Sequence, residues 1–362
     1  MKTKGMIKMT NEQRKELVRS HVYGLSIAEM AEIYGIDEAE IINTLTDMAA
    51  DIEDERAYRE MLAPKKQASA PLPAKAAAQA KQSTTYYGVD LSVHNGVVDM
   101  AKVKTSGKSF VFLREGYGDE LSYPGQKDTR FEQNYKNAKA AGLHVGAYHY
   151  MYATNVNSAK REAQGFINNL KGKSFDNPIA LDIEERSQYN LSNSTVEAIT
   201  KAFMDVCEQA GYYIMLYSYE SFLTAKFSSA FRSKYDVWCA NISRQPSISY
   251  GIWQYSFTGI IPGISGRVDL NRTAKDYPSI IKNAGKNGFS AGKVLDTEGF
   301  KRGDKLLGVY YLKRWLIAKG YSMDDNDTFG EGTEKAVNAI LNANGYAKNG
   351  IAGKNFAKKF IK

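Results

Sequence analysis

The chain has 362 residues, more than an ordinary single domain, so two or three folded units are expected. Charged residues make up 24% of it and hydrophobic residues 43%, which excludes a wholly disordered chain and a multi-span membrane protein. The formal net charge of +8 indicates attraction to an anionic partner, either a nucleic acid or an anionic cell wall.

Targeting, redox and metal signals are weak along the whole sequence. No apolar run reaches membrane-spanning length, so no membrane partner is expected. Residues 1–9 lack the apolar stretch of a secretory signal, which predicts a protein made in the cytoplasm. Cys207 and Cys239 are expected to be free thiols in the core, and no metal or cofactor is expected from the spacing of the histidines.

Residues 1–62 are predicted to form a small helical domain. Three capping boxes mark successive helix starts, and these are Thr10 with Gln13, Ser26 with Glu29, and Asp37 with Glu40. Gly24 and Gly35 stand where two of these helices are expected to stop. Residues 26–37 resemble the helix-turn-helix of sigma-factor and resolvase-like domains.

The charge of this helical domain disfavours DNA binding. From Ser20 to Glu55 there is no Lys or Arg, whereas ten Asp and Glu residues would repel phosphate. A helical bundle that self-associates, or that holds a neighbouring domain in check, is the favoured interpretation. A DNA-binding regulator is kept as an alternative, and no nucleic-acid partner is expected.

Residues 63–85 contain three of the eight prolines and few residues to bury, which predicts a flexible linker. In residues 86–284 short apolar runs alternate with helical patterns, as in a parallel sheet covered by helices. The candidate strands are 88–91, 110–114, 144–148, 179–183, 213–217, 237–240, 252–255 and 267–270. They predict an α/β fold, a modified TIM-like barrel with few helices, flanked by small all-α domains at both ends.

Four carboxylates follow apolar residues at strand ends of this predicted barrel. Asp182 and Glu184 are two residues apart, so on a strand both point to one face. Asp90 and Asp269 take similar positions in Gly-Val-Asp-Leu-Ser and Arg-Val-Asp-Leu-Asn. Because buried acids are costly and barrel active sites lie at the carboxyl ends of strands, the four are expected at a polar catalytic mouth.

Six ordered blocks within residues 86–281 resemble the signature of glycoside hydrolase family 25. They are GVDLSVHNG at 88–96, FVFLREG at 110–116, GAYHY at 146–150, LDIE at 181–184, IWQY at 252–255 and VDLN at 268–271. The resemblance implies an N-acetylmuramidase, a lysozyme that cleaves the β-1,4 bond between N-acetylmuramic acid and N-acetylglucosamine.

The resemblance also implies roles for particular residues. Glu184 matches the general acid, Asp182 its partner carboxylate, and Asp90 and Asp269 the other two acids of the family. The side chains expected to bind substrate are Tyr148, Tyr217, Trp253, Arg114 and His149. Strand residues i and i+2 lie about 6.5–7 Å apart, between the spacings typical of retaining and inverting enzymes, so the stereochemical course stays open.

Residues 285–362 are predicted to form a three-helix domain. The segment 316–321 recurs in similar form at 341–346, and in both a helix ends at a glycine followed by Tyr. This part resembles the type 1 peptidoglycan-binding domain, although Lys313 stands where that family usually has Gln. Bacterial peptidoglycan is therefore the expected partner.

Taken together, these features favour a modular phage endolysin that waits in the host cytoplasm and reaches the wall through a membrane pore. A non-catalytic wall-binding protein that kept the barrel is the first alternative, and the presence of all four acids argues against it.

Overall fold

The computed structural model describes residues 9–22, 24–62, 84–289 and 295–361. The chain divides into two compact units, Met1–Lys275 and Asp276–Lys362, so the N-terminal helices fall in the same unit as the barrel. Most of the predicted linker, residues 63–83, lies outside the described residues. Among the helices in the described ranges, none is both long and apolar enough to cross a membrane.

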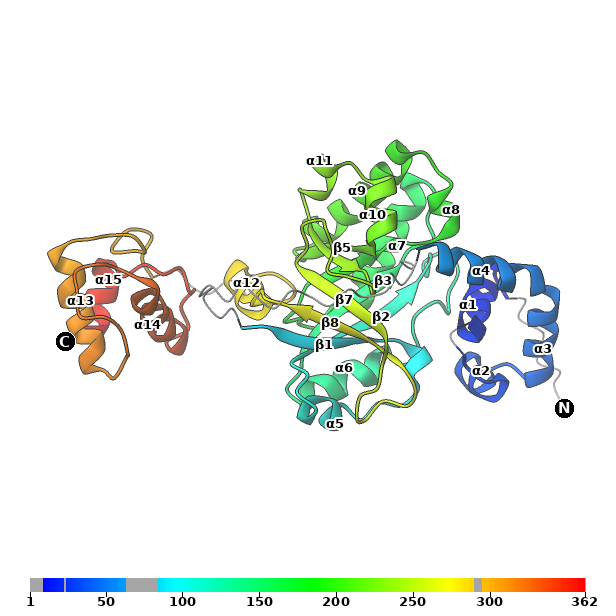
Figure 1. Cartoon of the computed structure of the whole chain (residues 1–362), viewed down its shortest axis with the longest axis horizontal. Coiled ribbons are helices and arrows are strands. Elements are labelled where there is room, and N and C mark those ends of the chain that lie inside the picture. Colours follow the sequence, from blue (N-terminus) through cyan, green and yellow to red (C-terminus); the bar gives the residue numbers. More distant parts are fainter. Residues whose placement is uncertain (1–8, 23, 63–83, 290–294, 362) are drawn as a thin grey trace. The chain divides into compact units, whose positions relative to one another are not determined.

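Eight strands close into a barrel in chain order, as predicted (Figure 1). They are β1 Tyr86–Leu91, β2 Phe110–Tyr117, β3 His144–Tyr150, β4 Ile179–Asp182, β5 Ile214–Tyr219, β6 Asp236–Ala240, β7 Ile252–Gly259 and β8 Val268–Thr273. Strands such as β2 and β4 are buried along their whole length, because one face lines the barrel and the other lies under helices.

The last strand departs from the parallel arrangement that the sequence predicted. β8 pairs antiparallel with both β7 and β1, whereas the six pairs from β1–β2 to β6–β7 are parallel. Only residues 260–267 join β7 to β8, and a parallel pair needs a crossover of a dozen residues or more. As a result, the beginning of β8 lies at the same end of the barrel as the carboxyl end of β1.

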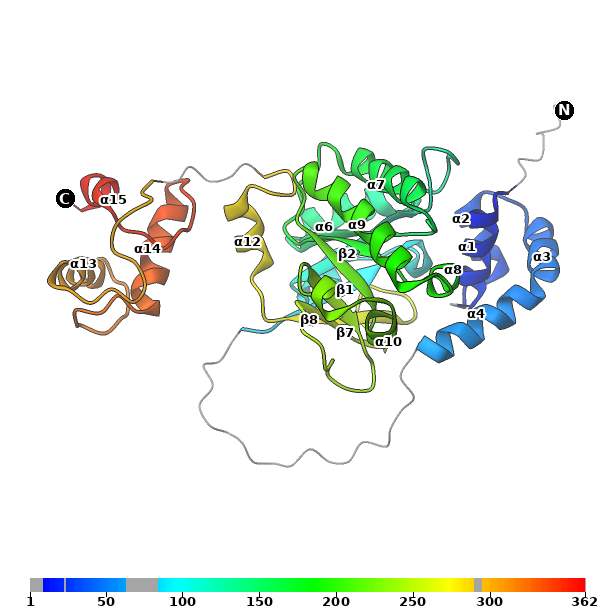
Figure 2. The same cartoon turned by 90° about the horizontal axis from the view of Figure 1, so that it is seen from above.

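Helices cover the outside of the barrel, and α7 and α9 pack side by side there (Figure 2). The helices of this layer are α5 Met100–Thr105, α6 Phe131–Ala140, α7 Val156–Leu170, α8 Arg186–Tyr189, α9 Asn193–Gln209, α10 Glu220–Lys226 and α11 Ser229–Arg232. A short 3-10 helix, Val93–Asn95, follows β1. Cys207 and Cys239 are buried free thiols.

Four helices precede the barrel, where the sequence marked three starts. They are α1 Asn11–Val22, α2 Ile27–Tyr34, α3 Glu38–Asp47 and α4 Ala49–Leu62. The capping boxes at Thr10 and Ser26 are formed, and Gly35 ends α2 in the left-handed conformation. α4 went unnoticed because it follows α3 after Met48 alone, without a capping side chain. A small core around Leu17, Met30 and Ile41 holds the bundle together.

The second unit contains α12 Tyr277–Ala284, α13 Leu307–Ala318, α14 Glu331–Ala343 and α15 Lys354–Phe360. The predicted repeat is structural: the amides of Tyr321 and Tyr346 donate to the carbonyls of Leu316 and Leu341, at 3.1 and 2.9 Å. Lys313 is buried, and its Nζ donates to Asn326 Oδ1 and to the carbonyl of Thr328. The residue at this unusual position therefore supports the fold of the unit.

Candidate active site

The four predicted acids lie in one cavity of about 460 Å³ at the carboxyl-end mouth of the barrel. Asp90 comes from β1, Asp182 from the end of β4, and Asp269 from β8; Glu184 lies two residues beyond β4. Glu184 and Asp182 are only 3% and 5% exposed. Side chains from three separate parts of the sequence thus place carboxylates in a single pocket.

Asp90 and Asp269 face each other across the β1–β8 pair. Gln254, on β7, joins them, because its Nε2 donates to Asp90 Oδ2 at 2.9 Å and to Asp269 Oδ2 at 3.1 Å. Asn271 Nδ2 also donates to Asp90 Oδ2, at 2.7 Å. Asp269 reaches the mouth because β8 is antiparallel, so it lies near the start of its strand and not at the end.

Asp182 and Glu184 each have one carboxylate oxygen without a hydrogen-bond partner among the described residues. Asp182 Oδ1 and Glu184 Oε2 are buried and accept no hydrogen bond from any residue in the described ranges. Buried polar atoms normally have partners, so both oxygens are suited to receive a hydrogen bond from a ligand or to exchange a proton with it. The other oxygen of Glu184, Oε1, lies 2.5 Å from Nη1 of Arg59 on α4.

Crowding favours the protonated form of several of these acids. Burial raises the pKa of Asp90 to about 6, and the charge of Glu184 adds to this effect. Burial raises the pKa of Asp182 well above its ordinary value, helped by repulsion from Glu184. The pKa of Asp269 is raised by burial and by repulsion from Asp90 and Glu184. The mouth can therefore retain protons near neutral pH, as acid-assisted bond cleavage requires.

Aromatic side chains form the floor beneath the acids. The ring centroid of Trp238 lies 4.7 Å from that of Tyr217 and 6.0 Å from that of Tyr148, and all three line the cavity. Arg114 lines it too, and its Nε donates to Asp128 at 2.9 Å. The structure thus brings Arg114, Tyr148 and Tyr217 together with the acids.

His149 lies on the other side of the sheet and does not line the cavity, contrary to the prediction that it contacts substrate. Successive side chains of β3 point to opposite faces, so Tyr148 and Tyr150 face the mouth and His149 faces outward. His149 is 2% exposed and lies between Glu115 and Glu162, at 2.9 and 3.4 Å. Burial opposes protonation, but the hydrogen bonds to both acids raise the pKa of His149 to about 9. It is a core histidine.

Trp253 also faces away from the cavity, contrary to the prediction. Its Nε1 donates to the carbonyl of Asn241 at 2.7 Å, and the guanidinium of Arg272 lies 4.2 Å from its ring centroid. Its neighbour on β7, Gln254, takes the inward position. Successive side chains of a strand point to opposite faces, so only one of the two can face the acids. The sequence predicted the aromatic residue, whereas the structure has Gln254 there.

Three residues of the site were not predicted, and these are Gln254, Trp238 and Asn271. Trp238 Nε1 donates to Asn271 Oδ1 at 2.8 Å and thereby fixes the amide that holds Asp90. Tyr217 OH donates to Gln254 Oε1 at 2.7 Å. Asn271 and Gln254 each stand within one of the six sequence blocks. Because side chains alternate between the two faces of β7 and β8, this alternation could have predicted that both face the mouth. Within the described ranges, no cluster of His, Cys, Asp or Glu is arranged as a metal site.

A closed barrel with buried, proton-retaining acids above an aromatic floor defines a glycoside hydrolase. Residues 89–264 match the family model of glycosyl hydrolases family 25.

Known proteins resemble the chain over this region. The autolytic lysozyme of Clostridium acetobutylicum is 28% identical over 253 residues, which cover 69% of this chain and 71% of that protein. Lysozyme M1 of Streptomyces globisporus is 31% identical over 206 residues, 51% of this chain and 66% of that protein. A crystal structure of a bacterial lysozyme from Streptomyces coelicolor, 28% identical, aligns with a TM-score of 0.46 over 53% of this chain and 93% of that one.

Proposed function

We propose that the protein is a muramidase that hydrolyses the β-1,4 bond between N-acetylmuramic acid and N-acetylglucosamine in bacterial peptidoglycan. The observation that carries this proposal is the grouping of Asp90, Asp182, Glu184 and Asp269 in one cavity of a barrel that matches the family 25 model. The relatives named as lysozymes support the choice of peptidoglycan as substrate.

In this proposal Glu184 donates a proton to the glycosidic oxygen as the bond to the anomeric carbon breaks. Water supplies the hydroxyl that ends on the anomeric carbon, and its proton restores the acid form of Glu184. Asp182, whose Oδ1 is unpaired, stabilises the positive charge that develops on the sugar. Asp90 and Asp269, tied together by Gln254, supply further negative potential at the mouth. Tyr148, Tyr217 and Trp238 line the cavity and supply aromatic side chains for contact with a sugar ring.

The test is hydrolysis of purified cell walls, followed by turbidity and by borohydride labelling of new reducing ends. The wild type is expected to expose reducing muramic acid. Glu184→Gln should lower the rate by about 10²–10⁴, the usual contribution of a general acid. Glu208→Gln, at an exposed position on α9, is the control and should leave the rate unchanged. Reducing glucosamine or new peptide amines would refute the muramidase assignment.

The second unit is proposed to hold the wall. This proposal rests on the resemblance of residues 285–362 to type 1 peptidoglycan-binding domains and on an apolar cavity of about 420 Å³. Phe300, Tyr311, Leu312 and Phe356 line that cavity. Binding by this unit would keep the barrel near its insoluble substrate.

A role as a phage endolysin, released from the cytoplasm to the wall, remains part of the proposal. The helix-turn-helix resemblance of residues 26–37 concerns α2 and the turn that leads to the N-cap of α3 at Asp37, and this segment carries acidic side chains such as Glu29 and Glu32. Their charge continues to disfavour binding to nucleic acid.

A further inference from the structure

The cavity that contains the acids is not formed by the barrel alone. Arg19 and Val22 of α1 and Glu55, Arg59 and Glu60 of α4 line it together with the catalytic carboxylates. The N-terminal helices therefore lie over the mouth where the glycan has to enter.

Arg59 contacts the proposed proton donor directly. Its Nη1 lies 2.5 Å from Glu184 Oε1, and its Nε lies 2.8 Å from Glu55 on the same helix. An ion pair with a guanidinium stabilises the carboxylate form of an acid, whereas a general acid must carry a proton. The guanidinium also places a positive charge where the glycosidase transition state develops one. The positive charge of Arg59 thus occupies the position beside Glu184 where the positively charged sugar of the transition state would lie.

Arg19 fills the neighbouring part of the cleft. It is 3% exposed, and its guanidinium carbon lies 4.0 Å from the ring centroid of Tyr150 and 4.9 Å from that of Tyr152. The guanidinium is also hydrogen-bonded to Glu185 and to Tyr152 OH. A cation stacked on aromatic rings and paired with a carboxylate is a strongly held contact in a desolvated site.

Glu16 makes the complementary contact with a basic residue of the barrel. It is fully buried, forms an ion pair with Arg114, and lies 3.0 Å from His94 Nε2. Although burial alone would raise the pKa of Glu16, Arg114 and His94 outweigh it and lower that pKa far below the ordinary value. Arg114, expected to bind substrate, is therefore occupied by an acid of the same chain.

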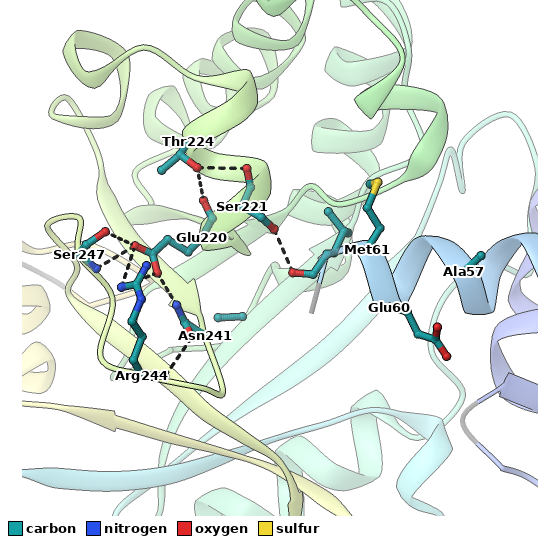
Figure 3. Close-up of a pocket in the computed structure, with 11 residues that line it drawn as sticks. Ala57, Glu60, Met61, Glu220, Ser221, Thr224, Asn241, Arg244 and Ser247 are labelled. Atoms are coloured by element: carbon teal, nitrogen blue, oxygen red, sulfur yellow. Dashed lines mark hydrogen bonds and ion pairs between the residues drawn. The ribbon is translucent and has the colours of Figure 1, made fainter. Parts of the chain in front are cut away.

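Contacts at the edges extend this interface. Lys15 Nζ lies 3.1 Å from Glu185 Oε1, and Asp54 lies 2.7 Å from Arg186. At the end of α4, Ser221 Oγ donates to the carbonyl of Leu62 at 3.0 Å, beside the polar cluster around Glu220 (Figure 3). Three of the five Lys and Arg residues of the bundle, Lys15, Arg19 and Arg59, thus contact the barrel, whereas Arg14 and Arg56 pair with acids of the bundle itself.

We infer that the N-terminal helical bundle, residues 9–62, is an intramolecular inhibitor that occupies the substrate cleft, with Arg59 and Arg19 as the residues that block it. The inference rests on the proposed function of the same cleft. Glycan can reach the acids only after the bundle leaves the mouth, so the chain exists in a closed, inactive form and an open, active form.

The decisive variant is the full chain carrying Arg19→Ala and Arg59→Ala. With the bundle docked, Glu184 loses its cationic partner and Glu185 keeps only Lys15, while both stay buried; with the bundle undocked, neither carboxylate depends on these arginines. The substitutions therefore penalise the closed form more than the open form, because the pairs of Arg19 and Arg59 with Glu55 lie within the bundle and are lost in both forms. The initial rate on cell walls should rise at least tenfold, which corresponds to about 1.4 kcal/mol of docking free energy. Arg56→Ala is the matched control, because Arg56 is an exposed residue of α4 paired only with Glu53 in the described structure; its rate should equal that of the wild type.

A second variant with a smaller expected effect keeps the inference testable if the first variant misfolds. Lys15→Ala with Asp54→Ala removes only the two partly exposed edge contacts, each worth little, and should raise the rate about two- to threefold. Thermal melting followed by circular dichroism checks that both variants retain a folded barrel.

Binding separates this inference from the proposed activity. The probe is a soluble tetrasaccharide of alternating N-acetylglucosamine and N-acetylmuramic acid, followed by the fluorescence of Trp238 in the cleft. Arg19→Ala with Arg59→Ala should bind it more tightly than the wild type. Tighter binding without hydrolysis would overturn the muramidase proposal and leave the inhibitor in place. Equal binding and equal rates in the wild type and both multiple variants would overturn the inhibitor.

Discussion

At the scale of single residues, Gln254 organises the mouth because one side-chain amide serves two acids. Its Nε2 reaches Asp90 and Asp269, while its Oε1 accepts the hydroxyl of Tyr217. Such an amide fixes the relative position of two carboxylates that would otherwise repel each other. Gln254 is 1% exposed, so no solvent replaces its hydrogen bonds if they are lost.

Gln254→Leu is therefore expected to lower kcat about 10- to 100-fold, with a smaller change in KM, since a positioning residue acts on the reacting geometry. Asp269 then loses the side-chain donor described above and Asp90 keeps only Asn271, which should also lower the free energy of unfolding by about 1–3 kcal/mol. Activity on soluble glycan and urea unfolding measure the two effects. Gln245→Leu, on an exposed loop, is the control, and a Gln254→Leu enzyme with wild-type kcat would contradict the positioning role.

Asp269 carries a cost in stability that depends on pH. Its pKa in the folded protein is raised above 3.8 by burial and by the charges of Asp90 and Glu184. A group with a raised folded pKa stabilises the fold below its unfolded pKa and loses that contribution as pH rises through the folded pKa. The contribution of Asp269 to stability should therefore fall as the pH rises from about 4 toward neutrality.

Asp269→Asn keeps an oxygen for Gln254 but removes the charge. Its melting temperature should exceed that of the wild type by several degrees at pH 7, and the difference should vanish near pH 3.5, where the aspartate is protonated in both states. Asp205→Asn, on the partly exposed face of α9, should show no such pH-dependent gain. A gain of equal size at both pH values would mean that repulsion at the mouth is not its cause.

At the scale of elements, the sequence was informative where a local period decides orientation. The spacing of Asp182 and Glu184 predicted that both point to one side, and both line the cavity although Glu184 lies beyond the end of β4. The caps at Thr10 and Ser26 located two helices. The same period was not applied to β7, so Trp253 was preferred to Gln254. The reversal of β8 depends on the short connection before it, and Asp269 was expected at a strand end although it lies near a strand start.

The contacts by which the N-terminal bundle covers the mouth could not be predicted from the sequence. The sequence indicated only that the bundle self-associates or holds a neighbouring domain in check. Its ion pairs join residues far apart in the chain, such as Arg59 with Glu184 and Arg19 with Glu185, which are 125 and 166 positions apart. Local patterns carry no information on such pairings. The one hint was the uneven charge of the bundle, in which Lys15, Arg19 and Arg59 flank a long acidic stretch.

At the scale of the whole molecule, the division into two compact units predicts that wall binding and bond cleavage can be separated. Asp296 is the point at which to test this. Its carboxylate accepts hydrogen bonds from the amides of Asn355 and Phe356, at 3.0 and 2.7 Å, and so caps the start of α15. Losing such a cap costs about 0.5–2 kcal/mol.

Asp296→Ala should lower the melting temperature of the second unit by several degrees in calorimetry and leave the barrel transition in place. Between the variant and wild-type melting temperatures of that unit, sedimentation with cell walls should drop while hydrolysis of the soluble tetrasaccharide stays unchanged. Asp324→Ala, at an exposed position of the same unit, should alter neither. Wall binding that survives melting of the second unit would place the binding surface on the barrel, and a parallel fall in soluble hydrolysis would show that the two units do not act independently.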